Sequence, residues 1–355
     1  MINVSVNASR HYDVVIGNGL ISEIGERIRK LHPKARNIAV VTDDNVKRLH
    51  LEPVTASIRG AGCSINTISV PPGEGSKSGS TFFSLLNWLA ESQFTRSDII
   101  VALGGGVVGD LAGFAAASYR RGVNFVQIPT TLLAMTDSSV GGKVAVNLEA
   151  GKNLAGAFYQ PSLVLCDTNT LETLPADVFG DGMAEVIKYG MIGNAGLLNE
   201  LQSPAAGIDE NIIARCVSIK RDVVAQDEFD TGKRMLLNFG HTIGHAIERL
   251  SGYKISHGRA VAAGMMIDTR AAVRLNLCPP ECLELLTAPL LRFNLPIQTD
   301  YTAEEIYEAA LHDKKRAGGE ITNIAPREAG RCELMTIPTG DLLGWIKTGL
   351  MDSPQ

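Results

Sequence analysis

Short runs of β-branched residues alternate with helical stretches in the first half of the chain, and this alternation limits the possible folds more than any other feature. The runs at residues 37–42 (NIAVVT), 64–70 (SINTISV) and 98–103 (DIIVAL) are typical of buried strands. Between two of them, residues 81–92 (TFFSLLNWLAES) have the apolar spacing of a helix. Strands that alternate with helices predict βα units and a parallel sheet.

The strand pattern extends further along the chain and then stops. Residues 124–128 (NFVQI) and 162–166 (SLVLC) continue it, and the N-terminal segments SVNAS and HYDVVIG predict a hairpin. After Pro175, one helical segment follows another from residue 178 to residue 308, separated by glycines and prolines. The boundary between the two patterns lies near residue 173.

The length of 355 residues and the hydrophobic content of 45% are sufficient for two large cores. We predict an α/β N-terminal nucleotide-binding domain with a mostly parallel sheet at residues 1–173, and an all-α C-terminal domain at residues 174–355. The net charge of −5 argues against a nucleic-acid or anionic-membrane partner, but it allows a local basic pocket for a small anion.

The chain shows no targeting or membrane-spanning pattern. Its N-terminus, MINVSVNASRHYDVVIG, lacks a basic segment followed by an apolar stretch, and no run of about 18 apolar residues occurs. The six cysteines are scattered and form no CxxC pair, which is typical of reduced structural thiols. We therefore expect a cytoplasmic protein.

The segment GKRMLLNFGHTIGHAIERL carries a polar stripe on an apolar background. Arg234, Asn238, His241 and His245 follow one another at i, i+4, i+7 and i+11, and on one helix they occupy an arc of roughly 60°. Apolar residues fill the other faces, which predicts a buried helix whose polar groups need partners. A metal or anion site is one explanation, and a hydrogen-bonded structural network is the other.

Histidine spacing suggests how a metal would be held. His241 and His245 are one helical turn apart, with His257 and Glu185 as more distant candidates. Three protein ligands and one open position suit a catalytic zinc, but spacing alone does not select the three. Glu185 and Lys188 are i, i+3 neighbours, a pattern that a surface ion pair also explains.

Three loops of the first half have compositions suited to phosphate. The loop at residues 104–110 (GGGVVGD) satisfies GxGxxG before an apolar helix, a weak signal that a structural turn also explains. It follows the third strand rather than the first, and an acidic candidate, Asp43, lies upstream. Residues 71–77 (PPGEGSK), with a carboxylate and an ammonium that could bracket a nucleotide, and the hydroxyl-rich residues 129–143 form the other two loops, and an ordinary turn also explains each of them.

Taken together, GGGVVGD, PTTLLAMTDSSVGGKVAVN, GKN, AEVIKYG, LLNFGHTIGHAIE and HG resemble the motifs of 3-dehydroquinate synthases, a family of sugar-phosphate cyclases. The resemblance spans most of the chain and implies a dehydroquinate synthase-like fold. It implies NAD, a divalent metal (zinc or cobalt), an anionic sugar-phosphate substrate and a homodimer. The metal ligands would be Glu185, His241 and His257. His245 would then not bind the metal but would contact the substrate and relay protons.

The resemblance also assigns the remaining site residues. Those for catalysis would be Lys143, Lys188, Lys220, Arg234, Asn238 and His245. Those for substrate binding would be Arg121, Asn153 and Lys314. Those for the cofactor would be Asp43, Asn45, Glu74, Lys77, Gly105, Gly106, Asp110, Thr130, Thr131, Asp137, Lys143, Lys152 and the segment from Thr170 to Thr173.

The implied reaction converts 3-deoxy-D-arabino-heptulosonate 7-phosphate to 3-dehydroquinate and phosphate, in the shikimate pathway. It proceeds by transient oxidation with NAD, β-elimination, reduction and intramolecular aldol closure, so NAD is regenerated. Another sugar-phosphate cyclase and a metal-dependent polyol dehydrogenase are the alternatives.

Two positions depart from the family pattern. Asp177-Val178 replaces a common Arg-Glu pair, and Arg259 replaces the glutamate of an HGEAV motif. The second change removes a carboxylate that could support a ligand histidine, and Glu248 is a candidate to replace it.

Overall fold

The computed structural model describes residues 1–203, 207–314 and 319–351, except for the side chains of residues 312–314. The chain forms two compact units, and each is described separately. The first comprises Met1–Pro175 and Asp209–Phe229, and the second comprises Ala176–Ile208 and Asp230–Gln355.

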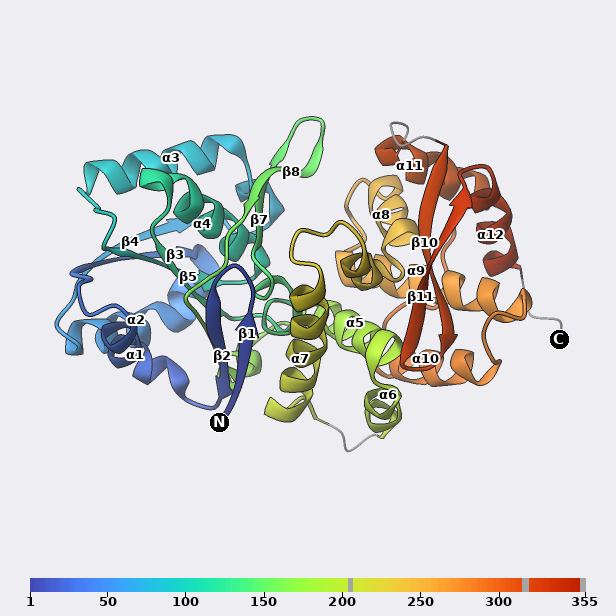
Figure 1. Cartoon of the computed structure of the whole chain (residues 1–355), viewed down its shortest axis with the longest axis horizontal. Coiled ribbons are helices and arrows are strands. Elements are labelled where there is room, and N and C mark those ends of the chain that lie inside the picture. Colours follow the sequence, from blue (N-terminus) through green and yellow to red (C-terminus); the bar gives the residue numbers. More distant parts are fainter. Residues whose placement is uncertain (204–206, 315–318, 352–355) are drawn as a thin grey trace. The chain divides into compact units, whose positions relative to one another are not determined.

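A seven-stranded sheet lies at the centre of the first unit (Figure 1). It is parallel except for the N-terminal hairpin, in which β1 pairs antiparallel with β2. The strand order is β1 (Ile2–Asn7), β2 (His11–Gly17), β9 (Leu163–Asp167), β6 (Asn124–Pro129), β5 (Ile99–Gly104), β3 (Asn37–Asp43) and β4 (Ser64–Val70). The predicted strands are therefore all present.

Helices cover both faces of this sheet, because alternate residues of a strand point to opposite faces. On one face, Ile38 and Val40 of β3 pack with α1 (Ile24–Leu31) and α2 (Asp44–Gly60). On the other, Ala39 and Val41 of the same strand pack with α3 (Gly79–Glu91) and α4 (Gly106–Ser118). A strand buried on both faces must be apolar at nearly every position, which explains the continuous run NIAVVT.

Two features of the first unit differ from what the sequence predicts. The loop expected at residues 129–143 contains one turn of π-helix, Ala134–Ser138, and then enters the hairpin formed by β7 (Lys143–Leu148) and β8 (Gly151–Phe158). Strand β7 (KVAVNL) is short and has only two buried apolar positions, Val144 and Val146, so the sequence gives little signal for it.

Helix α7 (Glu210–Gln226) also belongs to the first unit, where it packs on β1, β2 and the π-helical turn. The predicted two-part division places this helix in residues 174–355, so the compact units do not follow a single cut. A linear boundary cannot anticipate a helix that returns to pack on an earlier part of the chain.

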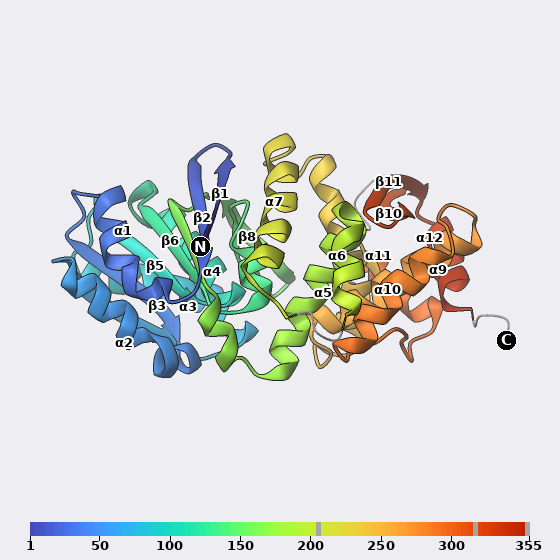
Figure 2. The ribbon, with the colours of Figure 1, turned by 90° about the horizontal axis from the view of Figure 1, so that it is seen from below.

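The second unit is built around the buried helix α9 (His257–Arg274), which contacts α5 (Ala176–Gly193), α8 (His241–Leu250), α10 (Glu281–Arg292) and α12 (Asp341–Leu350) (Figures 1 and 2). Its apolar core includes Ile267, Ala271 and Trp345. The other described α-helices of this unit are α6 (Ala195–Gln202) and α11 (Ala303–Lys314).

The predicted fold class is confirmed, with one correction to the all-α description of this unit. Strands β10 (Glu320–Glu328) and β11 (Arg331–Pro338) form an antiparallel hairpin whose buried face includes Ile321 and Ala325. Pro326 and the charged residues at the turn obscure the alternating pattern in the sequence.

None of the described helices combines the length and apolar character needed to cross a membrane. The six cysteines are buried and form no disulfide, as predicted.

Candidate functional site

The polar stripe of the sequence lies on two elements rather than on one continuous helix. Arg234 and Asn238 belong to a 3₁₀ helix, Lys233–Asn238, whereas His241 begins α8. Gly240 separates them with φ 77°, and a Cβ atom there would lie 2.8 Å from the backbone nitrogen of Met265. The expected single helix is therefore wrong, because close contact with α9 requires a left-handed glycine at this point.

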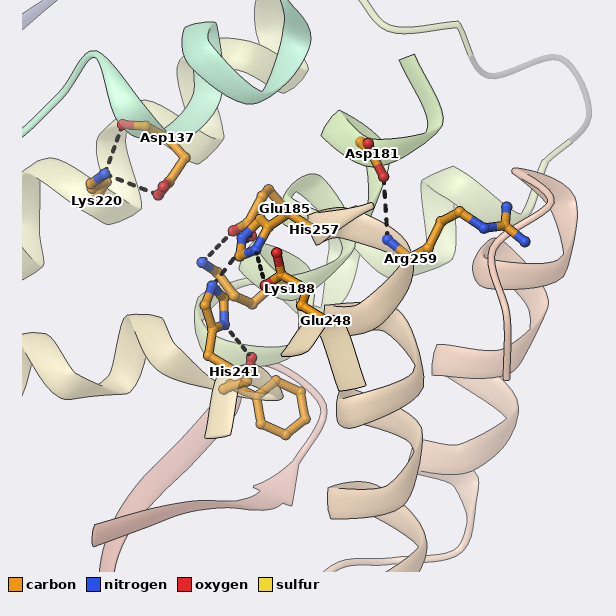
Figure 3. A network of polar contacts seen from close by, with 10 residues as sticks. Asp137, Asp181, Glu185, Lys188, Lys220, His241, Glu248, His257 and Arg259 are labelled. Carbon is orange, nitrogen blue, oxygen red and sulfur yellow. Dashed lines mark hydrogen bonds and ion pairs between the residues drawn. The ribbon is translucent and has the colours of Figure 1, made fainter. Parts of the chain in front are cut away.

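Three candidate metal ligands converge from three helices of the second unit (Figure 3). Glu185 lies in the middle of α5, and His241 and His257 are the first residues of α8 and α9. The Oε1 atom of Glu185 is 3.5 Å from Nε2 of His241 and 3.4 Å from Nε2 of His257. One potential ligand atom from each residue lies within 4.8 Å of the others.

The surroundings of Glu185 fit a cation. Its side chain is 1% exposed, and neither carboxylate oxygen accepts a well-aligned hydrogen bond from a described residue. Lys188 Nζ forms an ion pair with Glu185 Oε2, and both side chains are buried, so the surface ion-pair interpretation is wrong. A buried carboxylate facing two imidazole nitrogens matches the donor set of a catalytic zinc site.

The two candidate ligand histidines have opposite pKa shifts. Burial and the nearby Lys188 ammonium lower the pKa of His241. Burial also opposes protonation of His257, but the carboxylate of Glu185, 3.4 Å away, and the hydrogen bond with Glu248 outweigh it and raise the pKa of His257 to about 10. Burial alone would raise the pKa of Glu185, yet Lys188 and the imidazoles hold it well below its usual value. In the metal-free protein, these shifts favour the protonated form of His257 over protonation of His241 or Glu185.

His245 lies one turn after His241 on α8 and is exposed. Its ring centroid is 5.4 Å from that of His241 and 5.8 Å from that of His257. His245 belongs to a second group of potential metal ligands, with Glu248 and His257. His241 and His245, although one helical turn apart, are therefore not in the same group. His245 also lines a cavity of about 140 Å³ with Asn238, His241, Thr242, Ala246, Ala309 and Ala310.

In the first unit, the predicted cofactor residues gather at the carboxyl ends of neighbouring parallel strands. Asp43 ends β3 and caps α2 by accepting bonds from the backbone nitrogens of Asn45 and Val46. Gly105 and Gly106 follow β5 at the start of α4. This edge of an open α/β sheet is where ligands commonly bind.

Lys77 connects two loops at that edge. Its Nζ lies 2.5 Å from Asp110 Oδ2 and also bonds to Asn153 Oδ1, and it is only 5% exposed. The neighbouring loop is held by Asn147, whose amide donates to Glu74 Oε1 at 2.6 Å. Burial raises the pKa of Asp110, and Lys77 opposes that rise.

Lys220 and Asp137 form a second pair in the first unit. Lys220 Nζ donates to the Asp137 carboxylate at 2.9 Å and to its backbone oxygen at 2.7 Å (Figure 3). Lys220 is 5% exposed. Helix α7 therefore brings a predicted catalytic lysine to the π-helical turn that carries a predicted cofactor residue.

The other predicted residues have varied environments. Arg234 is buried and Asn238 is partly buried, while Arg121 and Lys143 are exposed and Lys152 is partly exposed. Thr130 and Thr170 are buried, and Thr131 is partly buried. The hydroxyl of Thr173 is hydrogen-bonded to Nε2 of His50. The side chain of Lys314, at the end of α11, lies outside the described residues.

Sequence reasoning missed two polar residues at these sites. Asn147 holds the loop of Glu74, and Asp181 accepts bonds at the start of α9 from Ser256 Oγ at 2.6 Å and from the backbone nitrogen of Arg259 at 3.2 Å. Asp181 precedes Glu185 by one helical turn, which is the only local signal for it. No local sequence signal points to Asn147.

Comparisons with known proteins identify the family. The model described as 3-dehydroquinate synthase N-terminal matches residues 67–181, and the C-terminal model of the same family matches residues 182–316. This chain belongs to the 3-dehydroquinate synthase family. The resemblance found in its motifs is thereby confirmed.

Full-length relatives agree with this assignment. The chain is 44% identical to 3-dehydroquinate synthase of Enterococcus faecalis, over 94% of this chain and 95% of the relative. It is 42% identical to the enzyme of Clostridium kluyveri, over 97% of this chain and 98% of the relative.

Solved structures of two synthases and of a dehydrogenase have the same fold. A 2-deoxy-scyllo-inosose synthase complexed with carbaglucose-6-phosphate, NAD⁺ and Co²⁺ gives a TM-score of 0.84 at 26% identity, covering 98% of this chain and all of that one. A 2-epi-5-epi-valiolone synthase from Streptomyces hygroscopicus with NAD⁺ and Zn²⁺ gives 0.86 at 25% identity, covering 98% of each chain. A butanol dehydrogenase from Thermotoga maritima, at 16% identity and 0.64 with 99% and 98% covered, shares the fold alone.

Proposed function

We propose that this protein is a carbon–oxygen lyase that converts 3-deoxy-D-arabino-heptulosonate 7-phosphate into 3-dehydroquinate and phosphate, with NAD and a divalent metal as cofactors. The observation that carries the proposal is the convergence of His241 and His257 on the buried carboxylate of Glu185 beside Lys188, in a chain of the 3-dehydroquinate synthase family. The full-length relatives at 42% and 44% identity carry that name.

The metal would be held by Glu185, His241 and His257. These residues supply one carboxylate and two imidazoles, and a zinc or cobalt ion bound by them would polarise a substrate hydroxyl and make it more acidic. Lys188, paired with Glu185, keeps the carboxylate ionised and places a cation next to the site.

NAD would be held at the strand-end loops of the first unit, where it would supply the capacity for reversible hydride transfer. Asp43 at the end of β3 is suited to the ribose hydroxyls, and the α4 N-terminus after Gly105 is suited to the pyrophosphate. Lys77 and Asp110 hold the neighbouring loops together by their ion pair. The remaining assigned cofactor residues are Asn45, Glu74, Gly106, Thr130, Thr131, Asp137, Lys143, Lys152, Thr170 and Thr173.

The chain's own polar residues would bind and orient the substrate. Arg234 offers a fixed guanidinium fork for a carboxylate or phosphate, and Asn238 offers an amide close to it in sequence. His245, exposed at a cavity, is suited to move a proton. The other assigned contacts are Arg121, Lys143, Asn153, Lys188, Lys220 and Lys314.

The test is a paired assay with purified protein, NAD, zinc or cobalt, and 3-deoxy-D-arabino-heptulosonate 7-phosphate. We expect equal amounts of phosphate and 3-dehydroquinate, with no net NADH. Failure to release phosphate from this substrate, combined with release from another sugar phosphate, would assign a different cyclase activity. Steady accumulation of NADH from a polyol would instead assign a dehydrogenase.

We further propose that the enzyme works in the cytoplasm as a homodimer. The six free, buried cysteines support a reducing compartment. Sedimentation of the purified protein at several concentrations tests the dimer, and a single monomeric species throughout would contradict it.

A further inference from the structure

The imidazole of His257 has a different partner on each of its two nitrogens. Nε2 faces Glu185 Oε1 at 3.4 Å, within the candidate ligand group. Nδ1 lies 3.1 Å from Oε2 of Glu248, a carboxylate on α8 that is only 5% exposed (Figure 3). Glu248 is not among the residues assigned above to the metal, NAD or substrate.

This arrangement fixes both the tautomer and the direction of the ring. Once His257 has lost its second proton, as binding to a metal requires, a carboxylate that accepts the Nδ1 proton leaves the lone pair of Nε2 directed toward Glu185 and His241. It also limits rotation of the ring about the Cβ–Cγ bond. An outer carboxylate of this kind makes a ligand histidine more basic and holds it in the geometry that a metal requires.

The backbone that carries His257 is held by a second carboxylate, from α5. Asp181 accepts the bonds from Ser256 Oγ and the Arg259 backbone nitrogen, on either side of His257 and Gly258. Contact here is tight, since a Cβ on Gly258 would lie 2.3 Å from the backbone oxygen of Asp181. Asp181 lies one helical turn before Glu185 on α5. Its contact with the start of α9 therefore helps to position both Glu185 and His257.

The residue at position 259 does not contribute to the support of the ring. Arg259 is exposed, and its guanidinium donates to the backbone oxygen of Asn294 at 2.8 Å. The carboxylate next to His257 therefore comes from Glu248, although the family pattern would place a glutamate at 259.

We propose that Glu248 is a positioning residue for the metal, acting through Nδ1 of His257, and that Asp181 positions the backbone from which this ligand extends. The inference rests on the proposed metal-binding function of Glu185, His241 and His257. It requires Glu248 to affect metal affinity without itself binding the ion.

The experiment measures zinc affinity by competition with a chromophoric chelator, for the wild type and for Glu248→Ala, Glu248→Gln and Asp181→Asn. We expect Glu248→Ala to bind zinc about 10–100-fold more weakly, and Glu248→Gln, which keeps an acceptor oxygen, to lose less. Arg259→Ala is the matched control and should bind as the wild type does. The absorption spectrum of the cobalt form should change in Glu248→Ala, because the orientation of His257 is no longer fixed.

Thermal unfolding of the metal-free variants separates positioning from misfolding, and Glu248→Gln provides the measurement if Glu248→Ala is unstable. Unchanged zinc affinity in both Glu248 variants would overturn the inference. So would a second bound ion that is lost in His245→Ala and Glu248→Ala, since Glu248 would then be a ligand. By contrast, undiminished binding in Glu185→Ala would refute the proposed metal site itself.

Discussion

The strand-end loops of the first unit and the histidine group of the second, which is Glu185, His241 and His257, are built in different ways. In the loops, the predicted residues belong to short motifs that follow successive strands, and the parallel sheet brings their ends to one edge. In the histidine group, Glu185, His241 and His257 come from three helices far apart in sequence. Local motifs are thus enough for the loops, whereas the histidine group depends on helix packing.

This difference predicts that substitutions in one region leave the ligand of the other unaffected. Removing a helix-borne ligand should abolish metal binding, whereas removing one loop contact should only weaken cofactor binding, since many backbone groups share that task. The following predictions test this separation.

The largest effect is expected for His257→Ala. Loss of one of three ligands should reduce zinc affinity by about 100-fold or more, and turnover should be lost with it. Metal content after dialysis and the phosphate-release assay measure both. His11→Ala, an exposed histidine in the first unit, is the control. Full metal content in His257→Ala would contradict the ligand assignment.

Arg234→Ala should retain the metal but bind the substrate more weakly, by about 10–100-fold, because a charge-assisted fork to an anion is lost. Arg234 is 2% exposed, so Arg234→Lys is the companion variant that keeps the charge and most of the volume. Calorimetry with the substrate and zinc analysis report the two properties separately. A variant that loses zinc while remaining folded would show that the two functions are coupled.

Lys77→Met should weaken NAD binding by about tenfold and leave zinc affinity unchanged. The substitution removes the partner of Asp110 and the bond to Asn153, so the two loops are held less firmly. Fluorescence titration with NADH measures the change, and Lys30→Ala, at an exposed site on α1, is the control. An equal fall in zinc affinity would remove the distinction between the two regions.

The smallest effect is the release of about one proton when zinc binds near neutral pH. In the metal-free protein, the pKa of His257 is raised to about 10, so its imidazole is charged below that pH and must lose a proton to become a ligand. The pKa values of Glu185 and His241 are lowered, so these two groups contribute little to the number of protons released. Calorimetry in buffers of different ionisation enthalpy counts the protons. Zinc affinity should consequently fall as the pH is lowered, and binding without proton release would contradict this assignment.

Much of the fold could be predicted from sequence because its signals are local. The run NIAVVT, for example, is apolar at nearly every position, as a strand covered on both faces must be. The hairpin β10–β11 and the break at Gly240 could not be predicted in this way. They depend on packing against α9, which is invisible in a window of a few residues.

The sequence by itself determined the parallel sheet, the glycine-rich loops and, through motif resemblance, the family. Periodicity and turn residues act over short distances, and family motifs retain their order along the chain. Helix spacing left the third ligand open and motif resemblance assigned it to His257, but only the tertiary structure brings His257 into one ligand group with Glu185 and His241 and places Glu248 beside its Nδ1 atom. Those relations depend on the angles and contacts of α5, α8 and α9, because close approach at Gly240 and Gly258 determines which side chains meet.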